Sequence, residues 1–133
     1  MILKYTLAWV PMIFIAVANG IIRQFVYGPQ MSELSAHQIS CATAILLFFF
    51  YTRLLACLMP LKNPRQAFLI GGIWLILTVA FEFCFGLFIA GHSLDRLLHD
   101  YNVAAGRLWV MVLISLTLMP YIAFRMIPKT YDS

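Results

Sequence analysis

Long apolar stretches alternate with short polar breaks along the whole chain. A membrane-spanning α-helix needs roughly 20 mainly apolar residues to cross about 30 Å of hydrocarbon. Four stretches approach or exceed that length, and they run from Tyr5 to Tyr27, from His37 to Met59, from Ala67 to Gly91 and from Ala104 to Met126. The pattern therefore predicts four membrane-spanning helices.

The first two breaks carry residues typical of turns. Gly28 and Pro29 begin the first break, and Pro60 to Pro64 forms the second. Pro11 lies inside a predicted span, where it can kink a helix without ending it. Ala16 to Ala18 resembles a weak signal-peptide cleavage site, but we expect the first stretch to be retained as a span.

The third break, from His92 to Asn102, has a helical pattern of its own. Its apolar residues recur at helical spacing, and Ser93 is suited to cap a helix at its N-terminus. We expect a short helix in the membrane interface between the third and fourth spans. The candidate polar residues of this interfacial helix are His92, Asp95, His99 and Asp100.

The composition supports a membrane protein and excludes a soluble domain. Of the 133 residues, 63% are hydrophobic and 11% are charged, and the mean hydropathy of +0.91 lies well outside the range of soluble domains. We expect one domain over residues 1–133, an all-α integral membrane four-helix bundle. The net charge of +4 comes from scattered basic residues without a basic stripe, so we predict no nucleic-acid partner.

The basic residues near the span ends predict the orientation. Basic residues are enriched on the cytoplasmic side of membrane proteins. With the N-terminus inside, the cytoplasmic set is Lys4, Arg53, Lys62, Arg65, Arg125 and Lys129, and the outer set is Arg23, Arg96 and Arg107. This bias predicts that both termini are cytoplasmic.

Glu82 is the charged residue that fits worst in lipid. It lies nine residues before the end of the third span, which is about 13 Å along a helix. A carboxylate facing lipid there costs at least about 2.5 kcal/mol, so we expect Glu82 to face protein or a cavity. Gly71, Thr78 and Gly86 lie on the same helix face, and such small residues are typical of helix contacts in membranes.

Arg23 is the expected partner of Glu82. Helix side chains lean towards their own N-terminus, which points Arg23 deeper into the membrane. The predicted polar cluster consists of Asn19, Arg23, His37, Glu82 and Arg107. Two interpretations stay open. Arg23 and Glu82 form a buried ion pair that sets helix order, directly or through one water, or the cluster is a site for a proton, an ion or a ligand.

The histidines and cysteines give weaker signals. His92, Asp95 and His99 have a spacing compatible with a metal on one helix face, and His37 with His92 offers two axial ligands for a haem. We predict neither a metal nor another cofactor. Cys41, Cys57 and Cys84 lie in apolar segments without metal-type spacing, and we expect buried, inert packing cysteines.

Several short motifs resemble those of a group of small four-span bacterial inner-membrane proteins that has no assigned activity. The motifs are Ser35 to Ser40, Phe81 to Phe83 followed by Gly86, Gly91 to Ser93, Leu97-Leu98, Asp100 to Asn102 and Gly106 to Trp109. This resemblance implies a location in the bacterial inner membrane, and it brings no activity to carry over.

Three classes of function stay open after the sequence. The expected class is a non-enzymatic accessory or structural membrane component, because no nucleophile–base pair or phosphate loop is present. The second is a small oligomeric transporter or channel that uses Glu82 as a proton- or ion-responsive group. The third is a haem- or metal-binding redox subunit. The expected partners are the lipid bilayer and either a second copy of the chain or a larger membrane complex.

Overall fold

The computed structural model describes residues 2–89, 91–99 and 109–126, and this part of the chain contains helices and no strands. The first helix, α1, is followed directly by a π-helix and a 3-10 turn, and the third helix, α3, also continues into a π-helix. The elements are α1 (Ile2–Ile22), η1 (Arg23–Tyr27), η2 (Gly28–Gln30), α2 (Glu33–Leu58), α3 (Pro64–Cys84), η3 (Phe85–Ile89), α4 (Leu94–His99) and α5 (Trp109–Met126).

Two of the long helices begin at polar caps in the breaks. Ser32 precedes α2, and its Oγ accepts a hydrogen bond from the backbone N–H of Ser35 at 3.1 Å. Asn63 precedes α3, where its side chain accepts from the backbone N–H of Gln66 at 2.8 Å and Pro64 occupies the first helical position. These side chains satisfy amide groups that the first turn of a helix leaves without a partner.

The expected helical fold is confirmed, with four helices that are long and apolar enough to cross a membrane. The second and third helices begin earlier than the apolar stretches, at Glu33 and Pro64, because their N-caps lie in the polar breaks. The four candidate spans, with mean hydropathies of 1.8, 2.0, 2.1 and 1.6, are Ile2–Gln30, Glu33–Leu58, Pro64–Ile89 and Trp109–Met126. The predicted start of the fourth span at Ala104 lies outside the described residues.

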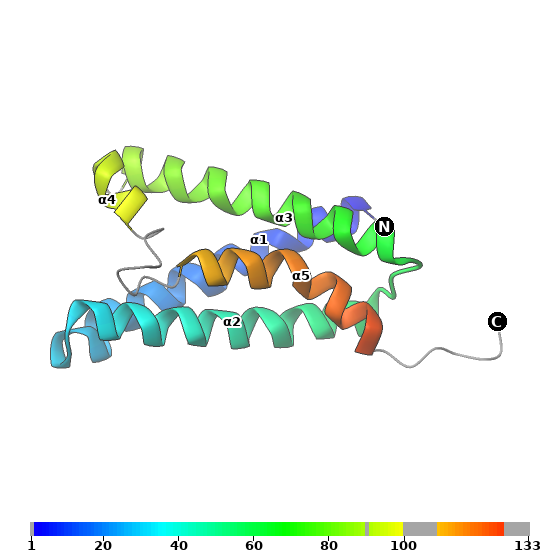
Figure 1. Cartoon of the computed structure of the whole chain (residues 1–133), viewed down its shortest axis with the longest axis horizontal. Coiled ribbons are helices and arrows are strands. Elements are labelled where there is room, and N and C mark those ends of the chain that lie inside the picture. The colour runs from blue at the N-terminus through cyan, green and yellow to red at the C-terminus, as the bar shows by residue number, and fades with distance from the viewer. Residues whose placement is uncertain (1, 90, 100–108, 127–133) are drawn as a thin grey trace.

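The long helices pack around one another as Figure 1 shows. α5 packs against both α2 and α3, and α1 also contacts both of them. α1 begins, α5 ends and α2 connects to α3 at one end of the molecule, which we name the connection end (Figure 1). α4 lies at the opposite end, which we name the α4 end.

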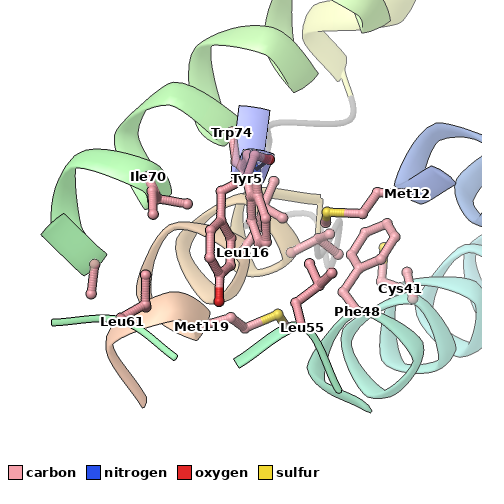
Figure 2. Packing of buried hydrophobic residues seen from close by; sticks show 13 residues of the cluster. Tyr5, Met12, Cys41, Phe48, Leu55, Leu61, Ile70, Trp74, Leu116 and Met119 are labelled. Carbon is pink, nitrogen blue, oxygen red and sulfur yellow. Dashed lines mark hydrogen bonds between the residues drawn. The ribbon is translucent and has the colours of Figure 1, made fainter. Parts of the chain in front are cut away.

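The connection half of the molecule is tightly packed. Figure 2 shows Tyr5, Trp74 and Leu116, which are completely buried, inside the cluster of apolar side chains. The Tyr5 hydroxyl donates to the backbone O of Met59 at 2.7 Å, and Trp74 Nε1 donates to the backbone O of Tyr5 at 2.8 Å. Because each polar side chain has a partner, this half closes without an unsatisfied indole or phenol in the cluster.

Gly71 marks the closest approach of α3 to α5. A Cβ atom placed on Gly71 would lie 2.9 Å from the carbonyl carbon of Thr117 in α5. Only a residue without a side chain allows the two backbones to come this close. Gly71, one residue of the predicted small-residue face, is therefore a helix contact in the structure.

The prediction for the cysteines was correct for one residue and wrong for two. Cys41 is buried and contacts His37, whereas Cys57 and Cys84 are exposed. The latter two lie on helix faces that are turned away from the neighbouring helices. An apolar segment alone does not show which of its faces packs against protein.

Candidate binding cavity

A cavity of about 590 Å³ lies in the α4 half of the molecule, between all four long helices and α4. This volume is within the usual range of pockets for small molecules. The polar and charged residues that line the cavity are Asn19, Arg23, Gln24, His37, Ser40, Thr78, Glu82, His92 and Trp109. Four of the five residues of the predicted polar cluster thus share one cavity. The fifth, Arg107, lies outside the described residues.

The cavity extends far along the helices. On the first helix its lining runs from Ile13 to Gln24, which corresponds to about 16 Å. Its deepest lining residues include Ile13, Phe48 and Thr78, and the Thr78 hydroxyl accepts a hydrogen bond from Trp9 Nε1 at 3.0 Å. Below this level the packed cluster of the connection half begins. The molecule is therefore hollow in one half and closed in the other.

One wall of the cavity is the seam between α1 and α2. Asn19 Nδ2 donates to the backbone O of Ser40 at 2.9 Å and lies 3.1 Å from its hydroxyl, and both residues are buried. Arg23 follows Asn19 by one turn, and His37 precedes Ser40 by one turn. Because the two helices are antiparallel, Arg23 and His37 lie at a similar level, about one turn closer to the α4 end.

The guanidinium of Arg23 lies over Gly20. Its Nη2 is 3.8 Å from the position that a Cβ atom of Gly20 would occupy. The side chain therefore runs back towards the N-terminus of its helix, in the direction predicted from helix geometry. A Cβ atom at Gly20 would be in ordinary van der Waals contact with the guanidinium.

Glu82 lines the opposite wall. Its Oε2 accepts a hydrogen bond from Trp109 Nε1 at 2.7 Å, which joins the end of α3 to the start of α5. Glu82 and Arg23 face the same cavity, but among the described residues no direct ion pair joins them. Coupling of the two charges through one water molecule stays a prediction.

α4 closes part of the cavity from its own end. Leu97 is buried, and a Cβ atom on Gly86 would lie 2.7 Å from its Cδ2, so α4 rests on a glycine of η3. The expected short helix with a Ser93 cap is confirmed, because Ser93 Oγ accepts from the backbone N–H of Arg96 at 3.1 Å. Its position in a membrane interface stays a prediction.

The candidate residues of the interfacial helix separate in the structure. His92 lines the cavity, whereas Asp95 and His99 are exposed and do not belong to its lining. Asp100 lies outside the described residues. In the described ranges no group of three His, Cys, Asp or Glu side chains is placed to hold a metal ion.

Both π-helical segments border the cavity. Arg23 and Gln24 belong to η1, and Phe85 and Gly86 belong to η3. π-helical turns are rare and occur often at functional sites, because the extra residue shifts side chains relative to the regular helix. Their position beside the polar lining supports a role for this half of the molecule.

The predicted polar cluster did not include four polar residues of the lining, namely Gln24, Ser40, Thr78 and Trp109, although Thr78 was placed on the helix face of Glu82. Ser40, Thr78 and Trp109 each make a hydrogen bond to another helix, either as acceptor or as donor. Trp109 carried a signal, because an indole N–H in a membrane span needs an acceptor and the Glu82 carboxylate, although assigned to Arg23, has two oxygens that can accept.

Comparison with known proteins found no match. No family model, no curated protein and no solved structure matches this chain.

Proposed function

We propose that this chain is a multi-pass protein of the bacterial inner membrane, with both termini cytoplasmic, that binds a small ligand in the cavity of its outer half. The observation that carries the proposal is the cavity of about 590 Å³ with Arg23 and Glu82 in its lining. The protein has no enzymatic role in this proposal. It is a binding component of the membrane.

The cavity favours binding over a purely structural role for the polar cluster. A structural ion pair is most effective when its charges touch and their remaining hydrogen bonds are satisfied. Here Arg23 and Glu82 surround an open volume and form no direct pair with each other in the described structure. The cavity is partly open and has a polar lining, so water or a ligand can enter it and solvate the two charges.

Transport is the second candidate, and the asymmetry of the molecule favours it. The cavity ends at a packed layer in which side-chain donors bind acceptors on other helices, namely Tyr5 to Met59, Trp9 to Thr78 and Tyr51 to Ala8. A hollow half above a closed half is the form of a one-sided state in alternating access. In this reading Glu82 is the proton- or ion-responsive group.

The first experiment tests whether water-soluble molecules enter the cavity from the outer side. In a chain with Cys41, Cys57 and Cys84 replaced by alanine, Val17→Cys places a thiol on the lining, and Phe14→Cys places one on a face that is 71% exposed away from it. A membrane-impermeant thiol reagent added outside should modify the thiol at Val17 and spare the thiol at Phe14. Protection of both thiols would contradict an open outer cavity.

The second experiment tests binding itself. Native mass spectrometry of the protein from mild detergent should show a retained small molecule or lipid. Ala44→Phe fills the cavity, because Ala44 is 5% exposed and lines it, whereas Ile76→Phe changes a residue that is 70% exposed and outside the lining. The ligand should be lost from the Ala44 variant and kept by the Ile76 variant. Equal retention by both variants would place the ligand elsewhere.

A further inference from the structure

We propose that the ligand carries one anionic group, a carboxylate or a phosphodiester, on an apolar chain, and that Arg23 binds the anionic group. This inference rests on the proposed function, since it assigns the chemistry of the molecule that occupies the cavity.

Arg23 is a cation in the cavity lining for which the described residues provide no hydrogen-bond acceptor. Among the described residues its guanidinium forms no hydrogen bond and no ion pair. A guanidinium offers five N–H donors in a planar fork that fits the two oxygens of a carboxylate or phosphodiester. A charged arginine within a membrane-spanning segment costs free energy unless it has such a partner.

The surroundings of Arg23 leave space for an anion on the α1–α2 wall. Gly20 lies beneath the guanidinium, and at its Cβ position the nearest atom is Nη2 at 3.8 Å. His37 lies at a similar level on α2, and its buried imidazole also lines the cavity. Two nitrogen-bearing side chains from two helices therefore border the same space, and no carboxylate of the described lining lies on this wall.

The charge of Glu82 favours binding of the anionic group at the α1–α2 wall, on the side of the cavity opposite Glu82. Its carboxylate already accepts the Trp109 indole N–H at 2.7 Å. A second negative charge placed beside it in a medium of low dielectric constant is repelled. The competing ligand class is an organic cation bound beside Glu82. The anion is favoured because the Glu82 carboxylate already has a protein donor, whereas the guanidinium of Arg23 has no acceptor among the described residues.

The rest of the cavity is suited to a hydrocarbon chain. Ile13, Ala44 and Phe48 line its deep part, and Phe81 and Phe85 stack with ring centroids 5.4 Å apart on the side of α3. Burial of each CH₂ group of a ligand against such surfaces contributes about 0.8 kcal/mol. A ligand with its anionic group near the α4 end and its apolar chain towards the middle of the molecule therefore matches the lining, which is charged near the α4 end and apolar at depth.

The test measures binding to the full chain in nanodiscs of phosphatidylcholine. The probe is a bromine-tagged undecanoate, which quenches the fluorescence of Trp109 when it enters the cavity, and its matched counterpart is a bromine-tagged undecyl trimethylammonium. Arg23→Gln removes the proposed partner. Arg96→Gln removes an equal charge from an exposed position of α4 at the same end, so it controls for attraction to the surface. A minority of phosphatidylglycerol added to the nanodiscs shows whether a membrane lipid competes for the site.

The expected result is saturable quenching by the anionic probe. Arg23→Gln should weaken the affinity for this probe at least about tenfold, as for loss of a charged hydrogen bond. Arg96→Gln should leave the affinity unchanged. Competition by phosphatidylglycerol would identify a lipid as the source of the anion, and its absence would identify a free carboxylate. Equal weakening by the two arginine variants would overturn the inference. Binding of only the cationic probe would also overturn the inference, while the proposed function would stand. Binding of neither probe, together with protection of the thiols at Val17 and Phe14, would refute the inference and the proposed function.

Discussion

Gly71→Ala should destabilise the protein strongly, because it adds one methyl group where two helix backbones touch. The new Cβ would lie 2.9 Å from the carbonyl carbon and 3.4 Å from the Cα of Thr117. Carbon atoms in good contact are about 3.5–4.0 Å apart, so α3 and α5 must separate by roughly 1 Å at this point. Such overpacking typically costs about 1–3 kcal/mol.

The neighbouring glycine provides the matched control. A Cβ on Gly72 would have no atom within 4 Å. Gly72→Ala should therefore stabilise α3 by up to about 1 kcal/mol, since alanine is the better helix former. The two variants add the same methyl group at adjacent positions and gain the same helix propensity, so their free energies of unfolding should differ by the overpacking cost alone, about 1–3 kcal/mol.

Reversible unfolding in mixed micelles with increasing sodium dodecyl sulfate, followed by tryptophan fluorescence, gives both free energies. Trp74 is completely buried in the packed cluster and reports on its loss. Equal stability of the Gly71 and Gly72 variants would refute the close approach of α3 to α5. A loss in both variants would show that the helix, and not the contact, is sensitive to the methyl group.

Two further predictions concern the packed half and the orientation. Tyr5→Phe leaves the partly buried carbonyl of Met59 without its donor and should lower the free energy of unfolding by about 1–2 kcal/mol. Tyr121→Phe removes an exposed hydrogen bond and should change it little; similar losses for both variants in the same micelle assay would argue against the Tyr5–Met59 bond. Reporter fusions after Asn63 and Asp132 should both give cytoplasmic signals, and a fusion near Asp95 should give an external signal. An external signal at Asn63 would show the opposite orientation.

The sequence by itself determined the elements that depend on local chemistry. Long apolar stretches predicted the helices, and Ser93 predicted the start of α4, because a cap and the residues it serves are neighbours in the chain. The direction of the Arg23 side chain was also predictable, since every α-helix tilts its side chains towards its N-terminus. The energetic penalty for a charge in lipid singled out Glu82 before any contact was known.

Only the tertiary structure decided which groups meet. The sequence predicted that Arg23 and Glu82 are joined directly or through one water. The described structure places both on one cavity without a direct pair and gives Glu82 the indole of Trp109, so coupling through water stays a prediction. It also turned Cys57 outward from a segment that was expected to be buried on the basis of its apolar character. The physical reason is that helix periodicity defines the faces of each helix, whereas the rotation and separation of neighbouring helices depend on contacts between residues far apart in the chain, such as Gly71 with Thr117.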